Sequence, residues 1–351
     1  MNVAIKKMQD RCSIWKRTAA TLLLLAAALL PGSQARAVEE VNVYSLRQPF
    51  LIEPILQVFT RQSGIKVNVV YAPQGLIERL KQEGRNSPAD LLLTVDIGRL
   101  YDATEAGVLQ PVRTPVLEAN IPAPYRHPDG LWYALTLRAR VVFASKARVK
   151  PEELHSYEAL TAPLWKGRLC TRSSQHDYNI DLLASMIAHH GETYAEQWAR
   201  GLLENLARKP QGNDRAQVKA IKEGECDIAL VNTYYMGAML EDKEQRAWAD
   251  SVYLFFPNQA GRGAHVNLSG AGVTLSAPNK ANAIRLLEFL SGDVAQRLYA
   301  ERNHEYPVKP GVPWSPVVAS WGRFKADALP LTEIAKRRAA ALRTFDRVGF
   351  P

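Results

Sequence analysis

The sequence contains few of the residues that bind soft or borderline metal ions. It has seven histidines and three cysteines among 351 residues. Zinc and copper sites are built mainly from these side chains, so their scarcity argues against such a site. Calcium is bound by Asp and Glu clustered in one loop, and the sequence has no such loop. A metal bound by this chain therefore needs other donors.

The sequence also lacks the motifs that mark common enzymes. It has no G-x-S-x-G elbow, no H-E-x-x-H helix and no P-loop. Ser173 and Ser174 lie near His176, but without a positioned acid they do not form a catalytic triad. We therefore expect a binding protein that is not an enzyme, with a periplasmic enzyme as the least favoured alternative.

Beyond the first 37 residues, basic side chains are not concentrated in any one stretch of the sequence. The chain has 44 Lys and Arg against 35 Asp and Glu, and its first 37 residues hold six of the former and one of the latter. The remainder has a net charge of about +4, spread along the chain. This differs from the dense basic stripe of nucleic-acid-binding proteins, so no nucleic-acid partner is expected.

The N-terminus has the layout of a secretory signal peptide. Basic residues up to Arg17 precede an apolar run at 19–30, which is followed by Ala35-Arg36-Ala37. The run is shorter than the roughly 20 residues that a membrane-spanning helix needs, and the A-x-A pattern marks a cleavage site. We predict a signal peptide over 1–37 and export to the periplasm.

The remaining residues predict two α/β lobes. They exceed what one hydrophobic core usually serves. Strand and helix patterns alternate over 41–106 and again over 168–256, which indicates largely parallel sheets covered by helices. No Pro/Gly linker divides the chain, so it should cross between lobes more than once, near 136–142 and 264–270. We predict a first lobe of 38–136 plus 265–308 and a second of 137–264 plus 309–351, with a central cleft.

Four tyrosines lie where expected strands end. Tyr44 ends the strand 41–44, Tyr178 follows the strand 168–171, and Tyr234 and Tyr235 follow the strand 226–231. Ligands bind outside the carboxyl ends of strands in open α/β sheets. Each ring alone could instead pack in a core or at a helix start. Adjacent residues at a helix start point in different directions, so Tyr234 and Tyr235 are not easily buried together.

Phenolate oxygen is a hard donor that suits a hard cation, and Fe³⁺ is the hardest common biological metal ion. Its charge can deprotonate a phenol whose ordinary pKa is about 10. Three phenolates neutralise Fe³⁺ and leave coordination positions open for a small anion such as carbonate. Candidate anchors for that anion are Arg47, Arg138 and Arg140, for which ordinary salt bridging is the alternative role.

Several stretches resemble the periplasmic ferric-ion-binding proteins of bacterial iron ABC transporters. The most specific is the block that ends in NTYY at 232–235. The matching stretches cover most of the chain after the signal peptide and comprise VNVYSLRQ (41–48), SPADLLLTVDIGRLYDATEAGVLQ (87–110), LTLRARVVFASK (135–146), LWKGRLCTRSSQHDYNIDLLASMIAHHGE (164–192), KAIKEGECDIALVNTYYMGAML (219–240), EYPV (305–308) and VASWGRFKADALPLTEIAKRRAAAL (318–342).

The resemblance implies a transferrin-like, two-lobed type II periplasmic-binding-protein fold. It implies Fe³⁺ ligation by Tyr44, Tyr178, Tyr234 and Tyr235, an arginine-held anion in some members, and delivery to an inner-membrane ABC permease by a monomer. Some members carry a histidine ligand just before the first tyrosine, and this chain has Val43 there. His176 and Asn232 are expected to support the ligands without binding iron themselves.

Two cysteines, Cys170 and Cys226, remain once the signal peptide is removed. Both adjoin strands that should be neighbours in the second lobe, and export favours oxidation, so we predict a disulfide; two small buried hydrophobic residues are the alternative. Within the binding class, the alternative to ferric iron is a small anion or another organic solute.

Overall fold

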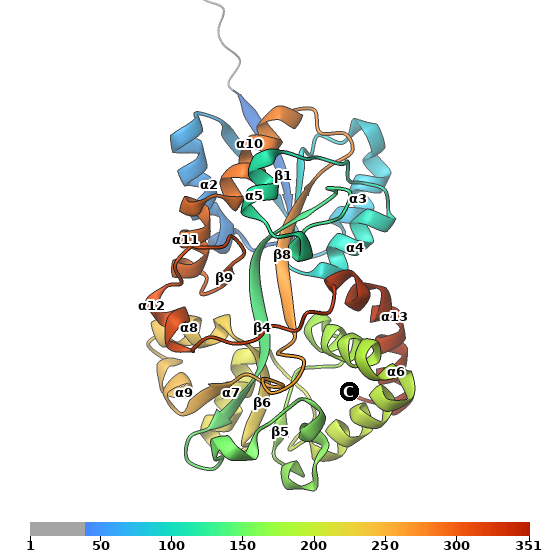
Figure 1. The fold of residues 1–351 in the computed structure, drawn as a ribbon, viewed down its shortest axis with the longest axis vertical. Coiled ribbons are helices and arrows are strands. Elements are labelled where there is room, and N and C mark those ends of the chain that lie inside the picture. The colour runs from blue at the N-terminus through green and yellow to red at the C-terminus, as the bar shows by residue number, and fades with distance from the viewer. Residues whose placement is uncertain (1–38) are drawn as a thin grey trace, which may run out of the picture. The chain divides into compact units, whose positions relative to one another are not determined.

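A computed structural model describes residues 39–351, and the signal peptide predicted for 1–37 lies outside the described residues. The first part of the chain builds a sheet with the strand order β2-β1-β3-β8-β4, of which Figure 1 labels β1, β8 and β4. Its first three strands, β1 (Glu40–Ser45), β2 (Lys66–Tyr71) and β3 (Leu91–Thr94), are parallel. The later strand β8 (Val266–Val273) returns antiparallel between β3 and β4 (Tyr133–Ser145).

Helices cover this first sheet, and we call the sheet with its helices the first lobe. The helices are α2 (Pro49–Ser63), α3 (Leu76–Glu83), α4 (Ile97–Glu105), α5 (Pro115–Asn120), α10 (Lys280–Ser291) and α11 (Asp293–Arg302). Helix α2 illustrates why they form: Pro49 occupies its first turn, where a missing N–H is harmless, and Gly64 ends it in a left-handed conformation. Its buried residues, Ile52, Ile55, Leu56 and Phe59, recur with helical spacing.

The second lobe is built around the far half of β4. Strands β6 (Ile228–Asn232) and β7 (Val252–Phe255) pair antiparallel with it, and β5 (Leu169–Cys170) runs parallel to β6. The surrounding helices are α6 (Asp177–Asn205), α7 (Asp214–Glu223), α8 (Tyr234–Glu241) and α9 (Arg246–Asp250). Gly191 interrupts α6 with a non-helical backbone, so two helical segments follow each other there.

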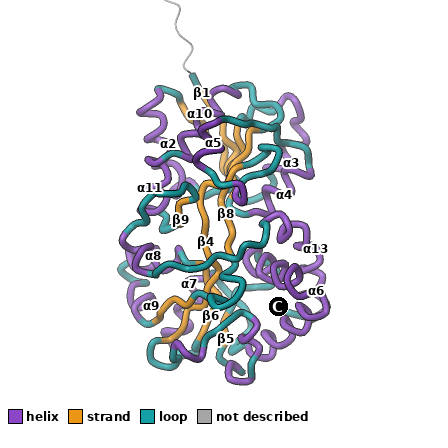
Figure 2. Tube along the Cα trace, viewed as in Figure 1, coloured by secondary structure: helices purple, strands orange, loops and turns teal. Residues whose placement is uncertain are grey.

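Strand β4 belongs to both lobes. Its residues Tyr133–Ala139 pair with β8, and from Arg140 onward they pair with β6. Figure 2 shows β4 and β8 side by side where the chain passes between the two halves. The chain therefore crosses through paired strands, within the segments expected for the crossings. The lobe boundaries given above stay a prediction.

The C-terminal part of the chain connects the lobes again. It contains β9 (Tyr306–Pro307), which pairs with β4, then α12 (Pro316–Ser320) and α13 (Leu331–Val348). Arg338 of α13 bonds to Asp96 at the start of α4 and to Asp181 and Asp177 of α6. Short 3-10 helices complete the fold at Gly84–Asn86, Ala123–Tyr125, Pro151–Glu153, Glu158–Thr161 and Pro163–Trp165.

Cys170 at the end of β5 and Cys226 just before β6 form a disulfide, with their Cα atoms 6.0 Å apart. The bond joins the two parallel strands whose ends lead to the cavity described below. Across residues 39–351, no helix has the length and apolar character needed to cross a bilayer.

Candidate functional site

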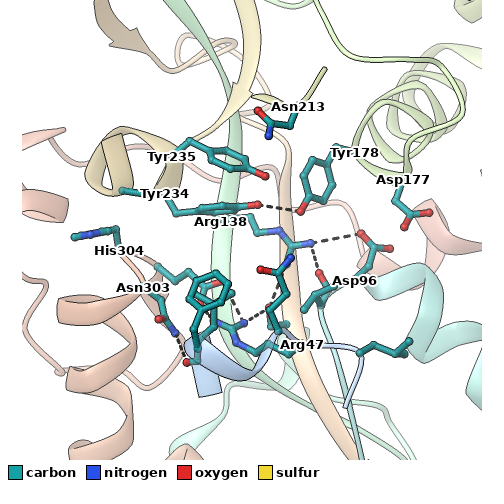
Figure 3. A pocket seen from close by; sticks show the side chains of 18 of the residues that line it. Arg47, Asp96, Arg138, Asp177, Tyr178, Asn213, Tyr234, Tyr235, Asn303 and His304 are labelled. Atoms are coloured by element: carbon teal, nitrogen blue, oxygen red, sulfur yellow. Dashed lines mark hydrogen bonds and ion pairs between the residues drawn. The ribbon is translucent and has the colours of Figure 1, made fainter. Parts of the chain in front are cut away.

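A cavity of about 800 Å³ lies between residues of the two lobes. Figure 3 shows side chains that line it. From the first lobe and its β8 strand come Arg47, Gln48, Phe50, Tyr71, Asp96, Arg99 and Ser269, and from the second come Arg172, Tyr178, Asn213, Arg215, Tyr234 and Tyr235. The wall thus combines aromatic hydroxyls with charges of both signs.

Three of the four predicted tyrosines meet in this cavity. Tyr178 lies in the first turn of α6, and Tyr234 and Tyr235 are the first residues of α8, directly after β6. The hydroxyl oxygens of Tyr178 and Tyr234 are 2.9 Å apart, and the ring centroids of Tyr234 and Tyr235 are 4.3 Å apart (Figure 3). All three residues are half-buried and line the cavity.

The surroundings of Tyr234 and Tyr235 favour the neutral form of their phenols. Burial, with the nearby Tyr178, raises the pKa of both Tyr234 and Tyr235 above the usual range. Three guanidinium groups, those of Arg138, Arg140 and Arg172, lie 5.3 to 5.7 Å from the centre of the Tyr178 ring. Nowhere within residues 39–351 do three His, Cys, Asp or Glu side chains gather closely enough to hold a metal. The phenol oxygens are therefore the strongest candidate donors.

Tyr44 lies apart from this cluster in the structure, so its role as an iron ligand stays a prediction that this geometry does not favour. Its hydroxyl donates to both carboxylate oxygens of Glu83, at 2.9 and 3.0 Å, and Arg79 lies 4.7 Å from its ring centre. The residue is buried, and it is absent from the cavity wall. Side chains alternate between the two faces of a strand, and Tyr44 points from β1 to the face covered by α3.

Of the three predicted anion anchors, two line the cavity. Arg47 donates to Ser269 at 2.8 Å and pairs with Glu305 at 2.5 Å. Arg138 donates to the backbone oxygen of Val95 and lies 3.4 Å from Asp96 (Figure 3). Both arginines are buried and already form ion pairs with Glu305 and Asp96. They therefore contribute positive charge to the wall more readily than they form new hydrogen bonds to a ligand.

Arg140 lies outside the cavity wall, so its role as an anion anchor stays a prediction that this geometry does not favour. It pairs with Asp214 at 2.7 Å and donates to Asn179 at 3.0 Å and Asn232 at 3.3 Å. These partners are far away in the sequence, and together they bind both terminal nitrogens of the guanidinium. Asn232 thus holds Arg140 in place, two residues before Tyr234.

His176 supports Tyr178 as a neighbour. It is the N-cap of α6, and its Nδ1 accepts a hydrogen bond from the Tyr178 backbone N–H at 3.2 Å. Its ring meets the Tyr178 ring edge-on, with centroids 4.4 Å apart. Burial and the charge of Arg172 lower the pKa of His176 to about 4, so it is a neutral hydrogen-bond acceptor at neutral pH.

The sequence interpretation missed several residues of the cavity wall. Arg172 lies two residues beyond β5, with Nη1 3.6 Å from Asp214. Tyr71 ends β2 and lies at the wall of the cavity, with its side chain well exposed. Both positions satisfy the strand-end rule that identified the other tyrosines, so the rule applied to every strand would have found them. His304 follows α11 and carries no comparable signal in the sequence.

Comparison with known proteins places this geometry in a family. The family model described as bacterial extracellular solute-binding protein matches residues 86–320. The chain belongs to the bacterial extracellular solute-binding proteins. This solute-binding protein is 47% identical over 323 residues to iron uptake protein A1 of Synechocystis, with 91% of this chain and 89% of the relative covered.

Solved structures agree with this assignment. The ferric iron-binding protein A of Mannheimia haemolytica, in an open conformation, is 51% identical, with a TM-score of 0.84 over 89% of this chain and 99% of its own. The Trichodesmium protein in complex with iron and citrate ligands is 46% identical, with a TM-score of 0.85 over 89% of this chain and all of its own. The resemblance to periplasmic ferric-ion-binding proteins and the two-lobed type II fold are thereby confirmed.

Proposed function

We propose that this solute-binding protein captures one ferric ion through Tyr178, Tyr234 and Tyr235 and delivers it to an inner-membrane ABC transporter. The observation that carries the proposal is the convergence of these three hydroxyls in one cavity. Three phenolates balance the charge of Fe³⁺, and hard oxygen donors favour it over softer metals. Two relatives support the same ligand. The Synechocystis protein is named for iron uptake, and the Trichodesmium protein was solved in complex with iron and citrate.

A small anion completes the coordination in this proposal. Arg172 is the best-placed anchor, because it lines the cavity beside Tyr178 and its one close acidic partner lies 3.6 Å away. Arg47 and Arg138 also line the cavity and add positive charge to it. Carbonate fits this role, and the citrate found with iron in the Trichodesmium protein indicates that a carboxylate anion also suits such a cavity.

The proposal extends to location and motion. The signal peptide over 1–37 directs the protein to the periplasm, where it acts as a monomer. The lobes of 38–136 with 265–308 and 137–264 with 309–351 close over the ion, and the closed form is what the permease recognises. The open Mannheimia structure supports the existence of a second arrangement of the lobes.

Titration of the purified protein, without its signal peptide, tests the function. A ferric chelate should load about one ion per chain by metal analysis, and zinc or ferrous salts under the same conditions should not displace it. Loading of zinc in preference to Fe³⁺, or no loading at all, would remove the ferric assignment.

One observation favours a second candidate function, the binding of a small anion without iron. Six arginines line the cavity, at positions 47, 99, 138, 172, 215 and 302. Calorimetric titration with citrate in the absence of iron distinguishes the two. Tight citrate binding that iron does not strengthen favours the anion, whereas citrate binding that requires iron favours the ferric ion.

A further inference from the structure

His304 reaches from the first lobe to the helix that carries two of the tyrosines. It follows α11 and lines the same cavity as Tyr234 and Tyr235 (Figure 3). The residue is buried, and its backbone has a φ of 54°, in the left-handed region that non-glycine residues rarely adopt. A backbone conformation of this kind persists only where the surrounding structure imposes it.

The residues on both sides of His304 are fixed to the first lobe. Asn303 donates from Nδ2 to the backbone oxygen of Leu51 in α2 at 3.0 Å. Glu305 forms the 2.5 Å ion pair with Arg47. The segment 303–305 is therefore anchored at two points, and the imidazole ring between them projects as a rigid group.

The ring lies against the bare backbone of Gly237, in the first turns of α8. A Cβ atom at Gly237 would lie 2.6 Å from Cδ2 and from Nδ1 of His304, and closer still to Cγ. Gly237 has an ordinary helical backbone, so its conformation does not require glycine. Glycine inside a helix is less stable than alanine, and here it leaves room for the His304 ring.

The contact is steric packing. Neither ring nitrogen has a hydrogen-bond partner among the described residues. Glu241 Oε1 lies 3.4 Å from Nε2, in a geometry that is not a hydrogen bond. The ring thus fixes the distance between the 303–305 segment and α8 mainly by packing, with the Glu241 carboxylate of the same helix 3.4 Å from Nε2.

We propose that His304 is a positioning residue, through which the first lobe fixes α8, and with it Tyr234 and Tyr235, when the lobes close on the ligand. The proposal rests on the proposed function. Opening of the lobes withdraws the ring from Gly237, and closing restores the contact one turn of helix from Tyr234. His304 should therefore act on how long iron is retained and leave the ferric chromophore unchanged.

Two single variants and their combination test this role. Gly237→Ala inserts a methyl group into the contact, and His304→Gly removes the ring while relieving the backbone. Each should speed iron release to a competing chelator by about tenfold, as expected for loss of one packing contact that is made only in the closed state. Because the two changes affect one contact, the double variant should release iron no faster than His304→Gly alone.

Gly201→Ala provides the matched control. Gly201 is also a packed helical glycine, where a Cβ would lie 2.7 Å from Thr161 Cβ, and it lies outside the cavity wall. This variant should lower the melting temperature without changing the rate of iron release. Small-angle scattering of the iron-loaded proteins should give a larger radius of gyration for Gly237→Ala than for wild type or the control.

The outcomes separate the two proposals. A wild-type protein that does not load Fe³⁺ contradicts the proposed function. A wild type that loads iron, together with a His304→Gly variant that releases it at the wild-type rate, overturns the role of His304, even if Gly237→Ala fails to fold. Purely additive effects in the double variant overturn it as well.

Discussion

Strands β1 and β6 both bring a tyrosine to their carboxyl ends, yet only β6 delivers it to the cavity. Tyr44 is the second-last residue of β1, whereas Tyr234 is the second residue after the end of β6. A residue within a strand must point to one face of the sheet. A residue just beyond the strand is oriented by the turn and the following helix. In this pair of strands, the tyrosine just past the strand end reaches the cavity, and the tyrosine within the strand does not.

The two tyrosines also differ in what surrounds their oxygens. The Tyr44 hydroxyl donates a hydrogen bond to the Glu83 carboxylate. Burial and this carboxylate raise the pKa of Tyr44, so its hydroxyl stays protonated. Tyr234 instead faces another hydroxyl, with Arg138 nearby. A cation can replace the proton at Tyr234 at small structural cost, whereas at Tyr44 it would have to break an established pairing.

The largest expected effect comes from removing the oxygens at the end of β6. The double variant Tyr234→Phe, Tyr235→Phe keeps both rings and should weaken ferric binding by more than about a hundredfold, because even residues that only support metal ligands cost 10–100-fold. Competition with a ferric chelator measures the change. Unchanged iron retention in this folded variant would mean that the pair serves packing alone.

The second prediction uses pH to distinguish the cluster from an ordinary anion pocket. Burial raises the pKa of Tyr234 and of Tyr235, so both are protonated at neutral pH, and each phenol that binds iron must release a proton. Protons therefore compete with iron, and retention should decrease as the pH falls. Tyr234→Phe should reduce the steepness of this dependence by one proton. Retention that does not vary with pH in the wild type would contradict phenolate ligation.

The third prediction concerns the disulfide that joins β5 to the start of β6. Cys170 and Cys226 are separated by 56 residues, and replacing both by alanine should lower the free energy of unfolding by about 2–4 kcal/mol. Denaturant unfolding measures this. Mass spectrometry of the exported protein without reductant is the control, and two alkylatable thiols there would rule the bond out.

The smallest effect is expected at the end of β1. Tyr44→Phe removes one hydroxyl from Glu83, which keeps its bonds to Arg79 and Ser87. The free energy of unfolding should fall by about 0.5–1.5 kcal/mol, with iron retention unchanged. A loss of iron binding as large as that of the β6 pair would reinstate Tyr44 as a ligand.

Much of the fold follows from local patterns in the sequence. Buried strands such as 91–94 and 228–232 read as short apolar runs, and helices such as α2 are bounded by Pro and Gly. The same patterns located the strand ends where Tyr178, Tyr234 and Tyr235 meet. These features depend on periodicity and turn residues, which are properties of neighbouring positions.

The sequence does not reveal the position of a side chain when residues far away in the chain determine its partners. The pairing of Tyr44 with Glu83 could not be predicted, because the strand pattern does not say which face of the sheet α3 will cover. The position of Arg140 outside the cavity wall could not be predicted either, because its partners Asp214 and Asn179 come from other elements of the second lobe. The contact between His304 and Gly237 joins segments far apart in the sequence and leaves no local pattern.

The most direct test of the central claim is the visible spectrum of the ferric protein, since a phenolate bound to Fe³⁺ gives a charge-transfer band. Wild type, Tyr44→Phe and the triple variant Tyr178→Phe, Tyr234→Phe, Tyr235→Phe are titrated with the same ferric chelate. We predict one band of equal intensity in wild type and Tyr44→Phe, and no band in the triple variant. A band that persists in the triple variant, or one that disappears with Tyr44→Phe, would contradict a ferric site built from the second-lobe tyrosines.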